Sequence, residues 1–412
     1  MHTQTRLSSI LLAMVAPLAF APFANAATPA HTAAVGIEQI PAVALSYDGQ
    51  HLAWLVADSA GTRLELAGWN RRNPQTIVIP DDCRETGLRW SPRWYDLAVM
   101  TRCTGGAEGS VRSAIWVLDV NGSRTPRKIA NIEGSAHAMQ WSKNLKRIAF
   151  LYTPDSDAVQ SVASVAVTGD APEVITPANL DVHEFRLSRT GQRVAYTAVP
   201  VVGGTWTGQA NLYVQTARAG ATPMALVQAT NPASPVHGMR ISVPRWSAWD
   251  ARVFFLAGPS REGSIGGQLY AVPASGGAIA SYYDSSRRGA PAYWYTFMRN
   301  RLYMVTPAGH GQLAFSRYVF NSPGSIRSSR GYFTLPGMIS DGRAPYAVSM
   351  AWRHWPRIAF AQASATQAPE VRSGLLTPST PPVVTTINAG VHPAPADALG
   401  AAHAVADAQP RH

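Results

Sequence analysis

The stretch Gln140–Tyr152, QWSKNLKRIAFLY, contains a pattern that recurs along the chain and indicates its fold. It predicts an inner strand that ends at Trp141, a polar turn over 143–146 and an apolar second strand over 148–151. Ser142 opens the turn, and Ala149 lies seven residues later between two larger apolar residues. An apolar run of this length is typical of a strand that is buried on both faces.

The same frame occurs seven times along the chain. Neighbouring copies are 45 to 59 residues apart, and in each the apolar centre comes seven residues after the serine position. The residues at that position are Ser46, Ser91, Ser142, Ser188, Ser247, Thr296 and Trp352, of which the last two belong to weaker copies. Alanine occupies the centre in five copies, which suits sheets that approach closely. Seven units of this length are typical of propeller blades.

The sequence therefore predicts an all-β fold, a seven-bladed β-propeller of four-stranded antiparallel blades over residues 37–390. Charged residues are only 14% of the chain, against about 25% in average soluble domains, and glycine (33) and proline (31) are plentiful. This composition agrees with an all-β chain that has many turns. A β-sandwich with accidental regularity is the alternative, and seven aligned units argue against it.

The first 26 residues have the features of a secretory signal peptide. Arg6 supplies a basic start, residues 10–23 are almost wholly apolar, and Ala24-Asn25-Ala26 matches an A-x-A cleavage site. We expect cleavage after Ala26 and export to a periplasm or to the cell exterior. The apolar run is shorter than the ~20 residues of a spanning helix, so we expect no membrane span. Residues 391–412, rich in alanine and proline, are predicted to be a disordered tail.

The formal net charge of +11 is scattered along the chain and comes almost entirely from arginine. Nucleic-acid binding usually needs a concentrated basic patch, so no nucleic-acid partner is expected. No metal-ligand cluster or cofactor motif is evident, and we predict no metal and no cofactor.

The chain has two cysteines, Cys83 and Cys103. A lone pair in an oxidising compartment usually forms a disulfide. Cys83 precedes the first strand of the second unit and Cys103 follows its second strand, so the two lie at the open end of one hairpin. We predict a disulfide between them; the alternative is a pair of buried free thiols.

Three residues are candidate ligand contacts. His137 and His183 each lie five residues before the serine position of their unit, where they could face the central channel from adjacent blades. The alternative is that both are solvated loop histidines, and a metal would need more ligands. Trp206 lies in the loop 199–209 between glycines, where it could anchor a partner or fold back onto its own blade.

The repeats LSYDGQHLAW (45–54) and WSKNLKRIAF (141–150) resemble those of TolB-like propellers and of the propeller in the prolyl-oligopeptidase family of serine peptidases. The last unit is more similar to the second family. Pro369-Glu370-Val371 and Thr386-Ile387-Asn388 match the segment with which that propeller ends before the hydrolase domain. The resemblance covers about 37–390. It implies a propeller that caps an active site and limits which peptides enter.

The sequence departs from that family in its catalytic part. Only 24 residues follow Asn388, and no serine lies in a G-x-S-x-G nucleophile elbow. The nearest approach is Gly263–Gly267, where Glu262 occupies the position of the first glycine. No family catalytic residue is carried over. We therefore expect a non-catalytic, secreted module that binds a peptide or protein, or a truncated peptidase. The alternatives are a stand-alone TolB-like periplasmic scaffold and one part of a split peptidase with a separate hydrolase subunit.

Overall fold

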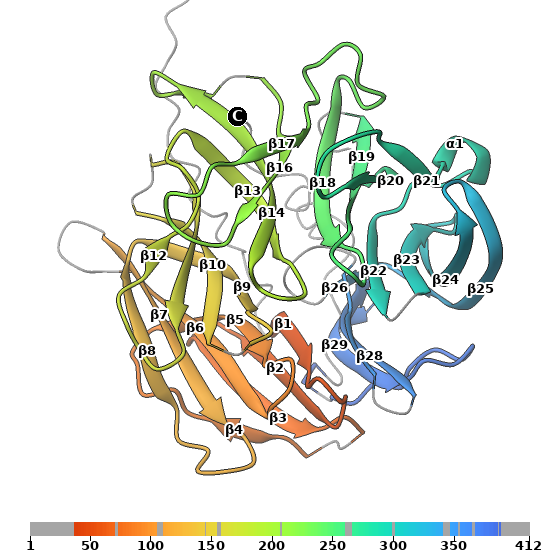
Figure 1. Ribbon diagram of the computed structural model, residues 1–412. Helices are drawn as coiled ribbons and strands as arrows, with labels where there is room; N and C mark the ends of the chain where they lie inside the picture. The colour runs from red at the N-terminus through yellow and green to blue at the C-terminus, as the bar shows by residue number, and fades with distance from the viewer. Residues whose placement is uncertain are drawn as a thin grey trace, which may run out of the picture. The chain divides into compact units, whose positions relative to one another are not determined.

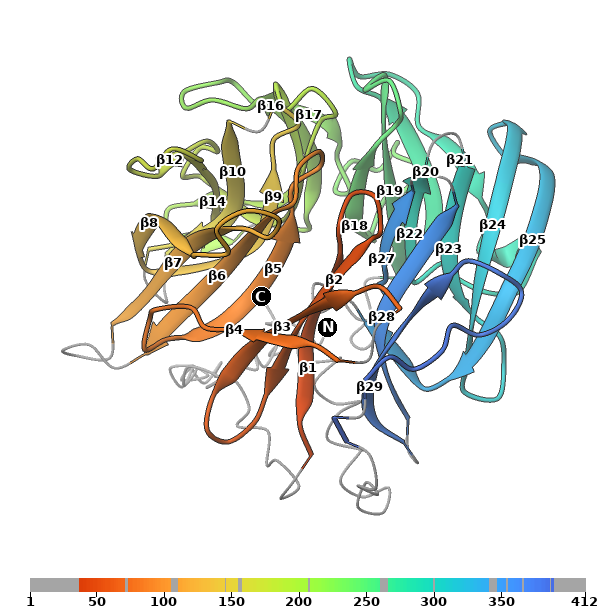
Figure 2. The same ribbon diagram turned by 90° about the horizontal axis from the view of Figure 1, so that it is seen from below.

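The computed structural model describes residues 37–388, apart from gaps at 71–72, 105–109, 145, 155–157, 207, 260–265, 299–300, 341–346, 353–354, 365–366 and 386. The predicted signal peptide and tail lie outside these residues. The described chain forms seven antiparallel sheets that follow one another around a central axis (Figures 1 and 2). The predicted seven-bladed propeller is confirmed. In the part described, no helix is long and apolar enough to cross a membrane.

Each of the first five blades is built from consecutive strands. Blade 1 contains β1 (Gln39–Leu45), β2 (His51–Ala57), β3 (Thr62–Gly68) and β4 (Gln75–Ile77). Blade 2 contains β5 (Arg84–Trp90), β6 (Asp96–Thr104), β7 (Val111–Asp119) and β8 (Arg127–Glu133). Blade 3 contains β9 (Ser135–Trp141), β10 (Arg147–Thr153), β11 (Ser161–Ala166) and β12 (Glu173–Val174). Blade 4 contains β13 (Leu180–Leu187), β14 (Arg193–Val202), β16 (Asn211–Thr216) and β17 (Met224–Val227), with β15 (Thr205–Trp206) beside β14. Blade 5 contains β18 (Met239–Trp246), β19 (Arg252–Pro259), β20 (Gln268–Pro273) and β21 (Ala280–Tyr283).

The last two blades follow the helix α1 (Ser285–Arg288). Blade 6 contains β22 (Trp294–Met298), β23 (Arg301–Pro307), β24 (Gln312–Ser322) and β25 (Ser325–Pro336). In blade 7, β26 (Met338–Ser340) and β27 (Ser349–Trp352) both pair with β28 (Pro356–Ser364), which also pairs with β29 (Gln367–Leu375). A bridge between Arg372 and Val383 marks the outermost position of this blade.

The recurring serine fixes the first hairpin of a blade. Its hydroxyl accepts a hydrogen bond from the backbone N–H five residues later in blades 1, 3, 4 and 5, at 3.0 to 3.2 Å. The donors are His51, Arg147, Arg193 and Arg252. Three residues after the serine the backbone is left-handed in three of these turns, where glycine is favoured because it has no Cβ. The residues there are Gly49, Gly191 and Asp250.

The seven-residue spacing does not hold structurally in blades 6 and 7. In blade 3 the centre, Ala149, pairs with Gln140, two residues before the serine position. In blade 6, Tyr303 pairs with Thr296 itself, and in blade 7 Ala359 pairs with Ser349. These first hairpins have shorter connections, so Thr296 and Trp352 are not equivalent to the serines. The number of blades is unaffected.

The core lies between adjacent blades. Seven clusters of buried apolar side chains each join one blade to the next, and the seventh joins blade 7 to blade 1. The five central alanines are at most 1% exposed, which confirms their place where blades approach closely; they are Ala53, Ala98, Ala149, Ala195 and Ala359.

A second link between blades is a hydrogen bond near the central channel. The indole N–H that precedes the recurring serine donates to a backbone carbonyl of the preceding blade in three cases, at 2.8 to 3.0 Å. These bonds join Trp90 to Ala44, Trp141 to Arg89 and Trp246 to Arg186. Where leucine replaces tryptophan, a side chain of the preceding blade accepts from the leucine backbone instead. Leu187 donates to Gln140 Oε1, and Leu45 to Ser349 Oγ.

Among the described residues, no strand is exchanged between the first and last blades where the ring closes. Asn388 Oδ1 accepts from the Glu38 N–H at 2.9 Å, and its Nδ2 donates to the Glu38 carbonyl at 3.0 Å. The Asn388 N–H donates to Glu370 Oε1 at 2.8 Å. The segment that resembles the end of a peptidase propeller therefore ties the two ends of the ring together.

Cys83 and Cys103 form a disulfide, as predicted, with their Cα atoms 4.6 Å apart. The bond joins the residue before β5 to the end of β6 and closes a segment of 20 residues within blade 2. It thereby holds the open end of the first hairpin of that blade.

Removal of the disulfide with the double variant Cys83→Ser and Cys103→Ser should lower the free energy of unfolding by about 3 kcal/mol, because the unfolded chain regains the entropy of a 20-residue loop. Urea denaturation with and without a reducing agent measures this. The reducing agent should shift the wild-type midpoint and leave that of the double variant in place. Equal midpoints for the oxidised wild type and the variant would contradict the prediction.

Substitution of Trp141 by phenylalanine should cost about 1 kcal/mol more than the same change at Trp54, since it orphans the Arg89 carbonyl. Both side chains are almost fully buried, but the Trp54 Nε1 has no hydrogen-bond partner among the described residues. The two variants lose the same atoms, so their difference in urea denaturation isolates the hydrogen bond. Equal losses would show that the bond between blades contributes nothing.

Candidate functional site

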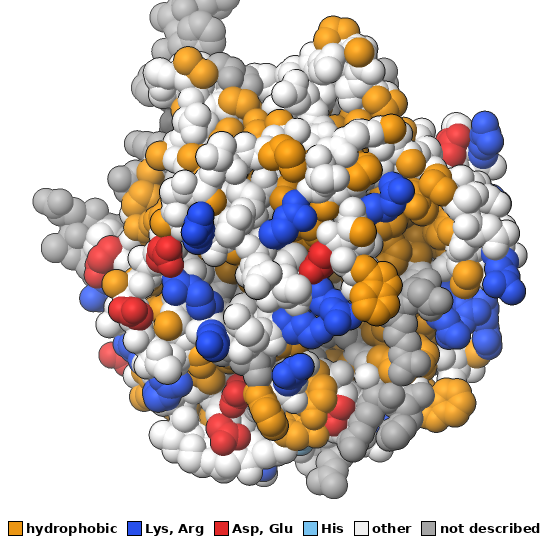
Figure 3. Space-filling view, viewed as in Figure 1, with side chains coloured by type: hydrophobic (Ala, Val, Ile, Leu, Met, Phe, Trp, Pro, Cys, Tyr) orange, Lys and Arg blue, Asp and Glu red, His pale blue; other side chains and the backbone are white. Residues whose placement is uncertain are grey.

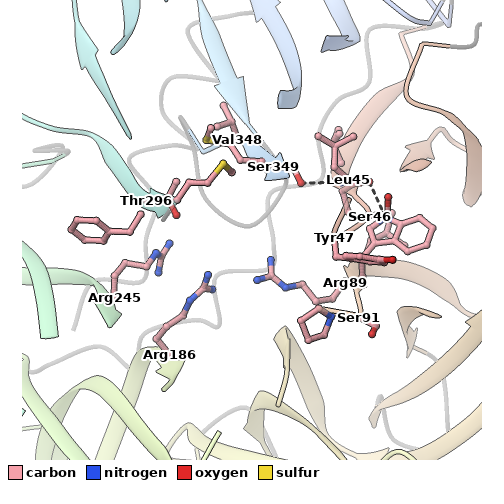
Figure 4. Close-up of a pocket in the computed structure, with 18 of the residues that line it drawn as sticks. Leu45, Ser46, Tyr47, Arg89, Ser91, Arg186, Arg245, Thr296, Val348 and Ser349 are labelled. Atoms are coloured by element: carbon pink, nitrogen blue, oxygen red, sulfur yellow. Dashed lines mark hydrogen bonds between the residues drawn. The ribbon is translucent and has the colours of Figure 1, made fainter. Parts of the chain in front are cut away.

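A cavity of about 240 Å³ lies where the innermost strands meet at one end of the channel. Its lining comes from β1, β5, β13, β18, β22 and β27, so six of the seven blades contribute. These strands reach the cavity with the ends that lead into the first hairpin turns. The cavity is therefore the mouth of the central channel, and Figure 4 shows its lining residues.

Three arginines reach into this mouth from one repeated position. Arg89, Arg186 and Arg245 each lie two residues before the serine of their blade and pair with its central residue. Their guanidinium groups point toward the middle of the cavity (Figure 4). The repeat thus places the same cationic group at the channel from blades 2, 4 and 5.

The hydrogen bonds between blades explain why these side chains remain available. The carbonyls of Arg89 and Arg186 accept from tryptophans of the next blades, so the link uses only their backbone. At the same position of blades 3 and 7, Gln140 and Ser349 use their side chains for the link. The arginine side chains are not needed to hold the ring together.

Among the described residues, none of the three arginines has a carboxylate within ion-pair distance. Arg245 Nη1 donates to the Pro244 carbonyl at 3.0 Å, while its buried Nε has no described partner. Burial and, to a smaller extent, the charge of Arg245 lower the pKa of Arg89 to about 10. Burial also lowers the pKa of Arg186, together with the charges of Arg245 and Arg89. The charge of Arg245 therefore disfavours the charged forms of the other two arginines.

One carboxyl group, that of Glu184, lies near Arg245. Burial raises its pKa, and the charge of Arg245 opposes this shift. Glu184 Oε2 accepts a hydrogen bond from the Val243 N–H at 2.6 Å. A single carboxylate cannot balance three guanidinium groups, so the mouth carries net positive charge.

The hairpin turns around the mouth form a rim of exposed aromatic and basic residues. We define the rim as Tyr47, Arg93, Trp94, Lys143, Arg189 and Trp249. Trp249 is 81% exposed and Trp94 61% exposed. The Arg189 guanidinium lies 5.3 Å from the centre of the Trp249 ring, a distance at which cation–π attraction acts. Burial lowers the pKa of Lys143, and the charges of Arg189 and Arg93 also lower it, so these basic groups lie close together. The space-filling view shows Lys and Arg side chains at the centre of the face drawn and further ones around it (Figure 3).

His137 and His183 lie on adjacent blades, as expected, but their registers differ. His137 pairs with Leu151, whereas His183 is the extra residue of a β-bulge between Val182 and Glu184. The bulge makes Glu184 the structural equivalent of His137. His137 is an exposed residue. Desolvation by the surrounding blades and the charge of Arg102 nevertheless lower its pKa to about 4. Ligand binding by either histidine stays a prediction.

Trp206 folds back onto its own blade, which was one of the two alternatives. Its indole N–H donates to Asp181 Oδ2 at 2.9 Å, and His183 Nε2 lies 3.4 Å from the same oxygen. Burial alone would raise the pKa of Asp181, but hydrogen bonds from His183, Gln160 and Trp206 together lower it. The structure thus brings Trp206 and His183 together around Asp181, away from the arginines.

In the part of the chain that is described, the group with metal-ligand spacing is Asp81, Cys83 and Cys103. The disulfide occupies both sulfurs, so no thiolate is available there. Residues 260–265, which include Ser264 of the nearest approach to a nucleophile elbow, lie outside the described residues.

The prediction from sequence missed the three arginines, although a signal was present. Each stands in the same local motif, an arginine followed by tryptophan or leucine and then serine: Arg89-Trp90-Ser91, Arg186-Leu187-Ser188 and Arg245-Trp246-Ser247. The motif gains meaning only when its first position is known to face the channel.

Substitution of Arg186 by methionine should raise the free energy of unfolding at neutral pH and low salt by up to about 1 kcal/mol, because it removes a buried cation that two others repel. Urea denaturation measures the change. Added salt should make the difference in free energy of unfolding smaller, because it screens the repulsion between the arginines. Arg327→Met, at an exposed position of β25, is the matched control and should have no effect. A less stable Arg186→Met protein would contradict the electrostatic account.

No known protein family matches the sequence, and no curated protein is similar to it. Solved structures are similar in fold. The β-propeller domain of the Trilobed protease from Pyrococcus furiosus, described as having an open velcro topology, has a TM-score of 0.54 at 10% identity, with 83% of this chain and 96% of that chain covered.

Two peptidases give similar scores. A prolyl endopeptidase has a TM-score of 0.55 at 14% identity over 84% of this chain and 50% of that one. An acylaminoacyl peptidase has a TM-score of 0.56 at 12% identity over 85% and 53%. The chain thus spans about half the length of these two proteins. At such identities the likeness shows the fold: a seven-bladed propeller similar to those of prolyl-oligopeptidase-type peptidases.

Proposed function

We propose that this protein is an exported, non-catalytic module that binds an acidic peptide segment of a protein partner on the rim of the channel mouth. The observation that carries the proposal is the rim itself. Large exposed aromatic side chains lie on the turns of blades 1, 2 and 5, which follow strands that line a positively charged cavity.

The chemistry of the rim favours a peptide as the ligand. Aromatic side chains contribute strongly to binding when a partner covers them, and tryptophan and tyrosine are among the commonest hot spots. Trp249 and Trp94 are mostly exposed here, so their apolar surface is available to a partner. Arg93, Lys143 and Arg189 add positive charge, which attracts acidic segments and raises their rate of association.

The proposal agrees with the role that the family resemblance implies, in which the propeller controls which peptides reach its channel. The partner could present the acidic segment from a separate hydrolase subunit or from another exported protein. In both cases the propeller contributes recognition, and the chemistry, if any, belongs to the partner.

Binding of a fluorescent acidic peptide of about ten residues, followed by anisotropy, tests the proposal. The acidic peptide should bind more tightly than one in which lysine replaces each acid. Trp249→Ala should weaken binding about tenfold or more, as loss of a hot spot does. Val78→Ala, at a 77% exposed apolar residue of blade 1 outside the rim, is the control and should bind as the wild type. Equal affinity for the acidic and basic peptides would refute the proposal.

The non-catalytic part is tested separately with a serine-reactive fluorophosphonate probe and with p-nitroanilide and ester substrates. The purified protein should show no specific labelling and no turnover. Specific labelling of one serine would overturn this part of the proposal.

A further inference from the structure

We propose that Arg89, Arg186 and Arg245 form an oxyanion-binding site inside the channel mouth, which receives a carboxylate group of the bound peptide. This inference rests on the proposed peptide binding for the source of the carboxylate. The site itself stands on the geometry of the cavity. The carboxylate comes from the end of a peptide chain or from an acidic side chain.

The three arginine side chains converge on one cavity. Three guanidinium groups from three blades point into one cavity of about 240 Å³, which has room for a small group but not for a folded domain. Each guanidinium offers five N–H donors in a planar arrangement that matches the two oxygens of a carboxylate. Donors that meet from several directions can hold one oxyanion from several sides.

The guanidinium groups have few hydrogen-bond acceptors among the described residues. The Arg245 Nε is buried without a partner among the described residues, and a buried donor without an acceptor costs free energy. Arg89 and Arg186 form no side-chain hydrogen bond or ion pair with any described residue. An oxyanion at the centre of the mouth would supply the acceptors that this part of the chain lacks.

The charges of the mouth are not balanced. Arg245 lowers the pKa of both Arg89 and Arg186, and Arg89 lowers that of Arg186 as well. Glu184 is the only carboxyl group among the described residues whose charge acts on any of the three. A bound anion stabilises all three cations at once. Charge-assisted hydrogen bonds of this kind are stronger than those between neutral groups.

The neighbouring positions argue that this charge is not a by-product of the fold. The equivalent residues of blades 1, 3, 6 and 7 are Ala44, Gln140, Thr296 and Ser349, all uncharged. The ring therefore forms without arginine at this position. Arginine on blades 2, 4 and 5 is expected to lower the stability of the protein through repulsion. Binding of an anionic ligand explains why arginine is nevertheless present at these positions.

Thermal unfolding with small anions tests the site without any peptide. Citrate and phosphate, compared with chloride at equal ionic strength, should raise the melting temperature of the wild type by about 2 °C or more. Arg186→Met and Arg89→Met should each lose most of this shift, while Arg327→Met, the exposed control on β25, should keep it. Circular dichroism verifies that the variants are folded. No shift beyond that of chloride, or equal shifts in the wild type and Arg186→Met, would overturn the site.

Peptide binding then distinguishes the sources of the carboxylate. An acidic peptide is compared with its C-terminal amide and with a version in which glutamine replaces each glutamate. Arg186→Met should lower the affinity about tenfold for every form that keeps the recognised carboxylate. If the C-terminal amide binds more weakly than the acidic peptide, the recognised carboxylate is that of the chain end. If the glutamine version binds more weakly, the recognised carboxylate is that of a glutamate side chain. If neither change affects affinity, a peptide carboxylate is ruled out as the ligand.

The two proposals fail in different ways. Trp249→Ala removes contacts on the rim. It should weaken binding of the peptide but leave the rise in melting temperature with citrate unchanged. A citrate shift without any peptide binding would overturn the proposed function and the peptide source but not the anion site. Peptide binding that is equal in the wild type and Arg186→Met would overturn the anion site while the rim proposal stands.

Discussion

The hydrogen bond from a tryptophan of one blade to a channel carbonyl of the preceding blade is the interaction on which the rest of the structure depends. It connects neighbouring sheets near the channel and uses only the backbone of the accepting residue. The side chain at that position is then free to serve the channel. Where leucine replaces the tryptophan, the side chains of Gln140 and Ser349 supply the link and are no longer available. The form that this link takes thus leaves the side chains of Arg89 and Arg186 available and engages those of Gln140 and Ser349.

Much of the fold could be predicted because its signals are local. The serine, the turn and the apolar strand of one hairpin lie within about a dozen residues, and Ser142 bonds to Arg147 only five residues away. Seven such hairpins gave the number of blades. Register was harder to predict, because the shorter hairpins of blades 6 and 7 and the bulge at His183 each shift the pairing by one or two residues. Such shifts leave little trace in hydrophobic periodicity.

The candidate site could not be predicted in the same way, because its residues are far apart along the chain. Arg89 and Arg245 are more than 150 residues apart, and along the chain their charges belong to a scattered background. Only closure of the ring makes them neighbours. The histidines were singled out because two copies shared an offset, yet the bulge removes the equivalence and Asp181 engages His183 instead. A repeated offset locates a residue on a strand but not the direction in which it faces.

The absence of strand exchange between the first and last blades has a consequence for how the chain could be rearranged. The interface between blades 7 and 1 is filled by an apolar cluster of the same kind as the other six, and Leu45 reaches Ser349 as Leu187 reaches Gln140. Every blade is also complete within one stretch of sequence. The ring consequently has cyclic equivalence: a circular permutant whose ends lie between two other blades would contain the same blades and the same interfaces.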